Sequence, residues 1–472
     1  MIQENKNIDY EWLTRPTGDP FVDAGGIVIK YFSEINPKKG ILDIIEEITK
    51  IYVNNWGGKL NAFFLNSTIT QSAFKGPRKI DETMKFFKEL INEQKEFKLG
   101  FCRITGRKTH LFYAGRDNHV LSGSKTFINF HHAYETGLFV SKEVLIRVFF
   151  IPFGLLQLSG KIALIQSNNL DVFEYFIRKN CSNNLSGLSS SIAKGVLKSE
   201  FKNPSNALFS FADSCISDLK IATYKEDVDK TNIKDTSLGM YHFTNFGASP
   251  EVQLYEIRST VFAFYATCLH PKLKKDWQPF IQYHYSNSKF KNASFDDVTY
   301  TWQSGKEVAE YSEYKVWQNQ VYEKLLNNQS IVSEILRWSK QRKFNFRIVE
   351  YYQIYLRNME QRTLEKIKEL ADFIVNKQET DKVKKSITRL NGSKSSHDVR
   401  YFLLRLIDKN YQDKNEQPLI TLDDYVQYLF PDGVNWREIR DLLLIAVYQK
   451  LHENQISLEL ELTENEEETI NE

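Results

Sequence analysis

The spacing of apolar and polar residues predicts two kinds of structure along this chain of 472 residues. Residues 100–170 contain short β-branched and aromatic runs interrupted by glycine and proline, a pattern that favours strands. These runs are FCRITGR, HLFYAG and RVFFIPF. From about residue 315 onwards, apolar residues recur every three or four positions, as they do in amphipathic helices. We therefore expect an α+β fold, with a mixed α/β N-terminal domain over residues 1–330 and a C-terminal helical bundle over residues 331–455.

The expected bundle has recognisable helical faces. One helix carries two apolar stripes separated by a step of five: Ile348, Tyr352, Tyr355 and Met359, then Leu364, Ile367, Ala371 and Ile374. We interpret the step as a stripe that shifts around one helix. The last helix has an apolar face made of Ile439, Leu442, Leu443, Ala446, Val447 and Leu451. Thr421 and Asp424 have the spacing of a capping box, which predicts that the helix before the last one begins at these residues.

Composition and hydropathy limit the possible settings of the chain. Its length fits two or three domains better than one compact core. The most apolar stretch, Val148–Leu158, contains Pro152 and Gly154 and is too short to cross a bilayer, so we expect it to be buried core. The polar, acidic residues Met1–Asp9 do not resemble a signal peptide. The four cysteines lie far apart in sequence, which favours a reducing, cytoplasmic setting without a dense disulfide framework.

Charge is distributed unevenly along the chain. Residues 456–472 contain seven Glu and no Lys or Arg, and we treat them as a separate acidic tail. Without this tail, the net formal charge of +2 becomes +9, because 62 basic residues face 53 acidic ones. A mildly basic body with an acidic tail is compatible with binding a polyanion.

Several segments resemble a known family in their order and spacing. TGDPFVDAGG (17–26) resembles the N-terminal signature of the large subunit of type I-B CRISPR Cascade complexes of the Cst subtype. Later blocks also match this family: FFLNSTITQSAFK (63–75), NFHHAYETGL (129–138) with LIQSNN (164–169), and YHFTNFGASPEVQLYEI (241–257). The helical segments YYQIYLRNMEQRTLEKIKELADFI and WREIRDLLLIAVYQKL match its C-terminal end.

The sequence departs from this family at a structural zinc site. Many members of the family carry two Cys-x-x-Cys pairs, but here Cys102 is followed by Thr105 at the second position, and the second pair is absent. Tetrahedral zinc needs about four Cys or His ligands. Cys102 with His110, His119, His131 or His132 is the remaining combination. We expect instead that packing has replaced the metal, and we expect no cofactor.

The resemblance implies a non-catalytic role. Such a subunit recognises a short protospacer-adjacent motif in double-stranded DNA, promotes R-loop formation and holds the displaced strand, while CRISPR RNA (crRNA) reads the sequence by base pairing. The implied partners are crRNA, target DNA, the backbone and small Cascade subunits, and a recruited helicase-nuclease or transposition proteins. No membrane partner is expected.

Two N-terminal segments have the residues that a DNA-reading surface needs. Gly57, Gly58 and Lys59 combine two conformationally free glycines with a cation. A second segment runs from polar into basic residues: Asn66, Ser67, Thr70, Gln71, Lys75, Arg78 and Lys79. Asn and Gln reach base edges, whereas Lys and Arg bind phosphates. The alternative is structural, since Gly-Gly turns are common and Asn and Ser satisfy backbone groups in turns.

Two further segments are rich in cations. Residues 103–125 contain one acid, Asp117, and five cations: Arg103, Arg107, Lys108, Arg116 and Lys125. Residues 382–405 contain one acid, Asp398, and seven cations: Lys382, Lys384, Lys385, Arg389, Lys394, Arg400 and Arg405. For the second segment we expect a basic ridge that follows the backbone of a single strand. For residues 103–125, the alternative to a nucleic-acid-binding face is an ordinary solvated surface.

Two other functions stay open. A metal-dependent nuclease needs clustered carboxylates or histidines, and the adjacent His131 and His132 are the most notable pair. A scaffold subunit, the second alternative, would make no DNA contact of its own.

For Asp19 and Asp23 we favour a structural or subunit-docking role over a catalytic one. Met359 is either a core residue or an internal translation start that yields a separate small subunit.

Overall fold

The computed structural model divides the chain into two compact units. It describes residues 7–121, 137–189, 194–219, 235–245, 251–287, 290, 293–304, 307–309, 313–376, 379–413, 417–431 and 435–456. The first unit takes in the described residues up to Ser259 and the stretch around Tyr314, and the second takes in those from Thr260 onwards. Both helices and antiparallel sheets are present, and the second unit ends in a helical region, which confirms the predicted α+β class.

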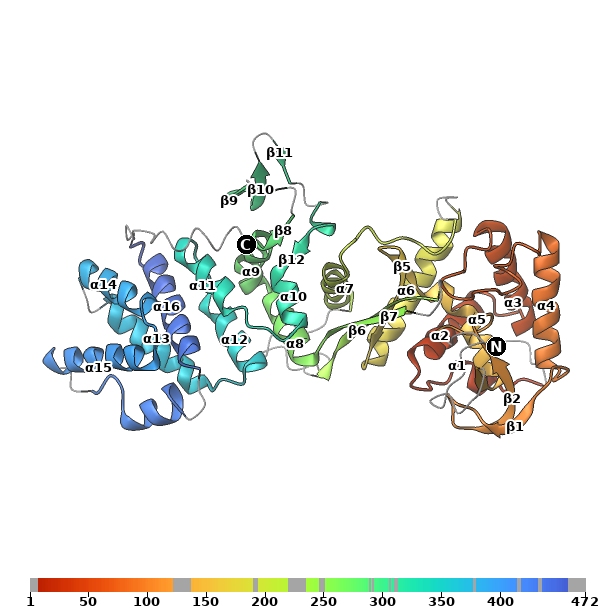
Figure 1. Ribbon diagram of the computed structural model, residues 1–472, viewed down its shortest axis with the longest axis horizontal. Coiled ribbons are helices and arrows are strands. Elements are labelled where there is room, and N and C mark those ends of the chain that lie inside the picture. Colours follow the sequence, from red (N-terminus) through yellow and green to blue (C-terminus); the bar gives the residue numbers. More distant parts are fainter. Residues whose placement is uncertain are drawn as a thin grey trace. The chain divides into compact units, whose positions relative to one another are not determined.

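The first unit contains a helical group and two antiparallel sheets (Figure 1). Its helices are α1 (Tyr10–Thr14), α2 (Pro20–Ile35), α3 (Ile41–Lys50), the π-helix η1 (Ile51–Asn55), α4 (Pro77–Ile91), α5 (Lys142–Gly154), α6 (Leu170–Ser189) and α7 (Pro204–Asp218). One sheet has the order β1 (Lys98–Phe101), β2 (Lys108–Ala114), β3 (Leu138–Val140). The other has the order β4 (Leu156–Leu158), β5 (Lys161–Ser167), β6 (Leu238–Thr244), β7 (Glu251–Ile257).

The central helix of the first unit is α5, and every one of its residues is buried. It begins at Ser141, whose side chain accepts from the backbone N–H of Val144, and it packs against α2, α4 and α6 (Figure 1). The prediction that RVFFIPF forms a strand is wrong, because this run lies inside α5. Burial on all sides removes the polar face by which a helix is recognised, and the aromatic run then resembles a strand. The prediction that Val148–Leu158 is core is confirmed, although Leu156 and Gln157 are only half-buried.

The TGDPFVDAGG segment holds α2 against α5. Asp19 caps α2 by accepting from the backbone N–H groups of Phe21 and Val22. Asp23 accepts from Arg147 Nη2 at 2.6 Å, and this guanidinium is fully buried. A Cβ on Gly25 would lie 2.0 Å from the Arg147 carbonyl oxygen, so only glycine allows the two helices to approach this closely. Both aspartates therefore have structural roles inside the chain, in agreement with a non-catalytic interpretation.

The second unit combines a helical bundle with short strands (Figure 1). Its first helices are α8 (Ser259–Cys268), α9 (Pro271–Tyr283) and α10 (Gln320–Leu326), and its strands are β8 (Tyr285–Ser286), β9 (Ser294–Asp296), β10 (Thr301–Ser304), β11 (Glu307–Val308) and β12 (Gln318–Asn319). The later helices are α11 (Val332–Gln341), α12 (Phe346–Leu356), α13 (Gln361–Asn376), α14 (Thr380–Asn391), α15 (Ser396–Gln412), η5 (Asp424–Leu429) and α16 (Trp436–Glu453). The 3-10 helix η4 (Glu313–Lys315) belongs to the first unit.

The apolar α16 is the centre of the bundle and contacts α11, α12, α13, α14 and α15. Its predicted apolar face is confirmed, because all six residues of that face are buried. The expected boundary between residues 330 and 331 lies inside the second unit. The reason is packing: the ring centroids of Phe264 in α8 and Tyr352 in α12 are 5.6 Å apart, which joins α8 to the bundle.

The positions of the helix ends test two predictions, the capping box at Thr421 and the single helix over residues 348–374. Thr421 and Asp424 form the predicted capping box, with the Asp424 N–H donating to Thr421 Oγ1 and the Thr421 N–H donating to Asp424 Oδ2. The single helix expected over residues 348–374 is wrong. Its step of five marks a break, because α12 ends at Leu356 and α13 begins at Gln361. Met359 lies between them, half-buried, and its role as a translation start stays a prediction.

Within the described part of the chain, no helix has both the length and the hydropathy needed to span a membrane.

Removing Arg147 should destabilise the first unit far more than removing an exposed arginine. Arg147→Ala leaves Asp23 and three backbone carbonyls without their donor, so we expect a loss of about 3–5 kcal/mol in the free energy of unfolding. Arg178→Ala is the matched control, since Arg178 pairs with Glu34 and Glu174 at the surface and should cost under ~1 kcal/mol. Urea denaturation measures both, and equal losses would contradict the structural role of Arg147.

The second unit should lose stability between pH 6.5 and pH 4 because of His284. Burial lowers the pKa of His284 from 6.5 to about 4, and its neutral ring donates from Nδ1 to the Phe280 carbonyl. The unfolded chain binds a proton in this window and the folded chain does not, so stability falls as the pH drops, by about 3 kcal/mol in total. In His284→Gln, the pH dependence of urea denaturation should be weaker by this amount. If His284→Gln and the unchanged protein show the same pH dependence, the prediction is wrong.

Candidate nucleic-acid interface

The two N-terminal candidate segments form one surface. The chain leaves η1 through Trp56 and turns at Gly57 and Gly58, whose φ angles are 60° and 72°. The Gly58 N–H donates to the Tyr52 carbonyl, and a Cβ at Gly58 would lie 2.7 Å from the Ile69 carbonyl oxygen. Lys79 Nζ donates to that same carbonyl. The glycine turn is therefore packed against the polar segment, which sequence spacing alone did not predict.

Most polar groups of this surface are engaged within the turn. Thr70 Oγ1 donates to the Phe64 carbonyl at 3.0 Å and lies 3.1 Å from Ser67 Oγ. Gln71 Nε2 donates to the Asn66 carbonyl at 2.5 Å, and Asn66 itself has a positive φ of 66°. These bonds agree with the turn-stabilising interpretation of Ser67, Thr70 and Gln71. Asn66 is exposed, and its backbone carbonyl is the group that accepts from Gln71.

Basic side chains border the same surface. Lys59 and Lys75 are exposed, and no ion pair involves either of them among the described residues. Arg78 is 69% exposed, lies 4.0 Å from Glu82 and stacks over the Phe74 ring at 5.3 Å. Lys79 differs, because its bond to Ile69 makes it part of the turn. Lys59, Lys75 and Arg78 are therefore the cations of this segment that solvent or a phosphate can reach.

The basic cluster at the β1–β2 turn is divided between structural and exposed cations. Arg107 pairs with Asp9 at 2.8 Å and with the buried Glu143 at 3.5 Å, and it stacks over Trp12. Arg103 and Lys108 are exposed, whereas Arg116 donates to the Asn245 carbonyl. Lys125 lies outside the described residues. Arg107 is therefore held by the N-terminal segment, and Arg103 and Lys108 are the outward-facing pair.

The basic ridge of the second unit lies on α14 and α15. Val383, Ile387 and Leu390 are buried, and Lys382 and Lys385 on the opposite side of α14 are exposed, whereas Arg389 is half-buried. Lys384 is half-buried beside them, and Lys394 and Arg400 are exposed. Lys382 pairs with Glu379 at 3.2 Å. Asp398 is occupied by the N-terminal cap of α15, where it accepts from Ser395 and from the Lys394 N–H. The exposed cations of the predicted ridge thus lie on two consecutive helices and on the turn between them, and their role in binding nucleic acid stays a prediction.

Sequence analysis missed Tyr401, which lies within this ridge. Its ring is stacked on His397 with an interplanar angle of 11°, and it receives Arg389 at 5.1 Å and Arg405 at 4.8 Å. Arg405 Nη2 also donates to Tyr401 Oη at 3.1 Å. This hydrogen bond, and then the charges of Arg405 and Arg389, lower the pKa of Tyr401. The signal in the sequence was the spacing of four between His397, Tyr401 and Arg405.

The possible zinc ligands are not brought together. Cys102 is buried, and its Sγ accepts from the Ser141 N–H. His110 pairs with Glu93, and His119 is buried against the Val120 carbonyl. His131 and His132 lie outside the described residues. In the part of the chain that the structure describes, no three His, Cys, Asp or Glu side chains gather in a way that could hold a metal ion.

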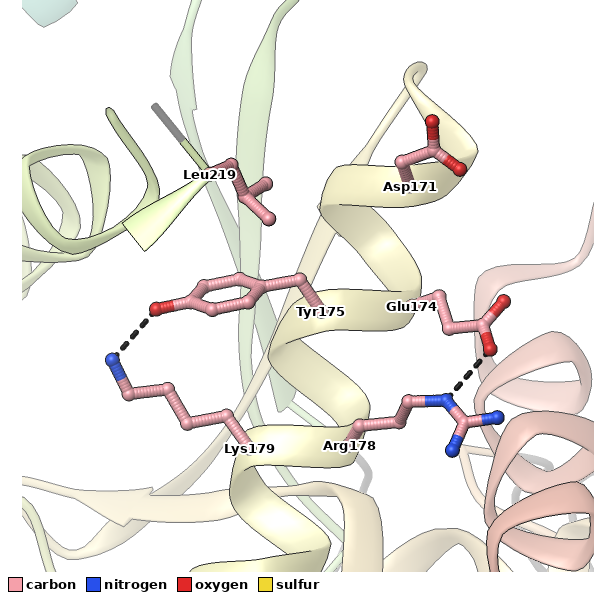
Figure 2. A pocket seen from close by; sticks show the side chains of 6 residues that line it. All are labelled: Asp171, Glu174, Tyr175, Arg178, Lys179 and Leu219. Carbon is pink, nitrogen blue, oxygen red and sulfur yellow. Dashed lines mark hydrogen bonds and ion pairs between the residues drawn. The ribbon is translucent and has the colours of Figure 1, made fainter. Parts of the chain in front are cut away.

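An open hollow of about 500 Å³ lies on α6 (Figure 2), and both cations among its described lining residues are paired with carboxylates. Arg178 Nε donates to Glu174 at 2.6 Å, and Lys179 Nζ donates to Tyr175 Oη at 2.7 Å (Figure 2). Lys179 also pairs with Asp218 at 3.0 Å. The pairing raises the pKa of Lys179 and holds each side chain in place. Among these described residues, the hollow therefore lacks the unpaired cations that a polyanion site needs.

Comparison with known proteins identifies one family within the second unit. A family model described as the DevT C-terminal domain matches residues 336–471, which include α12 to α16 and the basic ridge. No curated protein matches the chain.

Tyr401 should ionise at a lower pH than an ordinary tyrosine. Arg405→Gln removes the hydrogen bond and the nearer charge, so the pKa of Tyr401 should move back up toward its ordinary value of 10.0. NMR of ring-labelled tyrosine, with Tyr401→Phe to assign the signal, measures the shift. An equal Tyr401 pKa in the unchanged protein and in Arg405→Gln would refute the contact.

Proposed function

We propose that this chain is the non-catalytic large subunit of a crRNA-guided type I-B Cascade surveillance complex in the cytoplasm. The observation that carries the proposal is the set of exposed cations on α14, on α15 and on the turn between them: Lys382, Lys385, Lys394, Arg400 and Arg405. Asp398 is the one acid within residues 382–405. The ordered resemblance of five sequence segments to that family supports the identity of the complex.

The two units supply different parts of this function. In the first unit, the exposed Gly57 and Asn66 accompany the exposed cations Lys59, Lys75 and Arg78, which suits contact with a short duplex motif, whereas Gly58 is buried beneath them. In the second unit, the ridge suits a displaced single strand, because its cations can follow the phosphates of the backbone. Base pairing with crRNA supplies the remaining sequence specificity, and a recruited helicase-nuclease or transposition machinery acts on the opened DNA.

Affinity purification tests the proposed assembly directly. The tagged chain, expressed together with its neighbouring genes, should retain uniform RNAs with a repeat-derived end and several copies of a backbone subunit. Metal-dependent cleavage of plain DNA by the isolated chain, in the absence of bound RNA, would instead support the nuclease alternative.

Charge reversal on the ridge separates DNA binding from a scaffold role. Lys382→Glu, Lys384→Glu and Lys385→Glu together should weaken target binding by the complex, and the slope of log affinity against log salt should become shallower by about one to two. The matched control is Lys272→Glu, Lys274→Glu and Lys275→Glu, which places the same changes at the same spacing on α9. Equal affinities for the ridge variant and the unchanged complex would support a scaffold without DNA contact.

A further inference from the structure

A cavity of about 300 Å³ lies beneath the polar segment of the first unit. Its closed side is apolar and consists of the buried Phe64, Phe87, Leu145 and Phe149. Its open side carries the exposed Asn66 and Asp117 and the half-buried Gln71 and Phe74. Small-ligand sites are concave, mainly apolar, contain a few polar groups and start at about 300 Å³. The cavity therefore has the size and lining of a site for one small ring.

The aromatic rings of this cavity meet edge to face. The ring centroids of Phe87 and Phe149 are 4.7 Å apart at 61°, and those of Phe86 and Phe87 are 5.2 Å apart at 89°. Such packing fixes the rings and offers a flat ligand both ring faces and ring edges. A flat heteroaromatic ring would gain stacking contacts that a phosphate or a sugar cannot make.

Charge also selects the ligand. Among the described residues that line the cavity, Asp117 is the single charged side chain, so an anionic group is disfavoured inside. The cations lie just outside it, on residues that follow Phe74 in sequence: Lys75 is exposed, and Arg78 stacks over the Phe74 ring. A nucleotide fits this arrangement when its base enters the cavity and its phosphate stays near these cations.

We propose that this cavity holds a single unstacked nucleobase, with Phe74 against its face and with Gln71 and Asp117 at its polar edge. The inference rests on the proposed function, because bound nucleic acid supplies the base. Asp117 accepts from the N–H groups of a base, and the N3–H of thymine is flanked by two carbonyl oxygens that repel a carboxylate, so bases with an exocyclic amino group bind more tightly than thymine. Flipped bases in other proteins are read in the same way, by stacking and by hydrogen bonds to one edge.

The test uses the full chain and free nucleoside 5′-monophosphates, with ribose 5-phosphate as the control ligand. Saturation-transfer NMR should show transfer to the base protons, and ribose 5-phosphate should bind more weakly. Phe74→Leu keeps the apolar bulk and loses the aromatic face, so binding should weaken by about fivefold or more. Gln71→Ala should also weaken binding, and Asp117→Asn should reduce the preference for amino-bearing bases.

Two neighbouring substitutions act as controls. Ser72→Ala and Ala73→Ser change residues between Gln71 and Phe74 that do not line the cavity, and base transfer should persist in both. Thermal unfolding confirms that each variant is folded.

The proposal is overturned if ribose 5-phosphate binds as well as the nucleotides, or if Phe74→Leu and Gln71→Ala bind like the unchanged chain. If the chain assembles with crRNA but fails this test, the base pocket is refuted and the Cascade assignment stands. If the chain binds nucleotides through Phe74 but recruits no RNA, the Cascade assignment is refuted and the base pocket stands.

Discussion

The buried Arg147 guanidinium is the interaction on which the first unit depends. Its Nε donates to the Val22 carbonyl, its Nη1 to the carbonyls of Trp12 and Arg15, and its Nη2 to the Asp23 carboxylate. A fully buried cation is tolerated only when its donors are satisfied, so these bonds fix where α1 and α2 lie against α5. Gly25 completes the arrangement by allowing backbone contact. Since α5 also contributes Leu145 and Phe149 to the cavity beneath the polar segment, the candidate surface depends on the same helix crossing.

The sequence pattern predicted fold class and helix faces well where one face of an element meets solvent. The apolar face of α16 and the capping box at Thr421 are examples, because each depends on residues close together in sequence. The pattern failed at α5, where burial on every side erased periodicity. It also failed at the step of five before Leu364, which marks a helix break rather than a drifting stripe. Both failures arise from tertiary packing, which local spacing does not encode.

The candidate site was predictable to a similar extent. Clusters of like charge are visible in sequence, and the cations of the ridge lie on the consecutive helices α14 and α15 and on the turn between them. Which cations are neutralised was not predictable, since Arg107 is paired by Asp9, nearly a hundred residues earlier in the chain. Tyr401 was missed although its spacing of four to Arg405 is visible in the sequence, and its contact with Arg389 on the neighbouring helix was not predictable from spacing. The cavity was also missed, because its walls come from four separate segments of the chain.

The small net charge of the chain does not show that, among the described residues, some of its cations are paired inside the fold while others are exposed and unpaired. Arg147, Arg107 and Arg178 each face carboxylates, and their charges serve to position helices. Lys394 and Arg400 lie exposed on a part of the chain where the nearest acid in sequence, Asp398, is occupied by a helix cap. A charge that is compensated inside the chain adds little to the field felt by a polyanion, whereas an uncompensated one adds its full share. The local balance of paired and unpaired cations, rather than the total of +2, is therefore the quantity that favours nucleic acid as the partner.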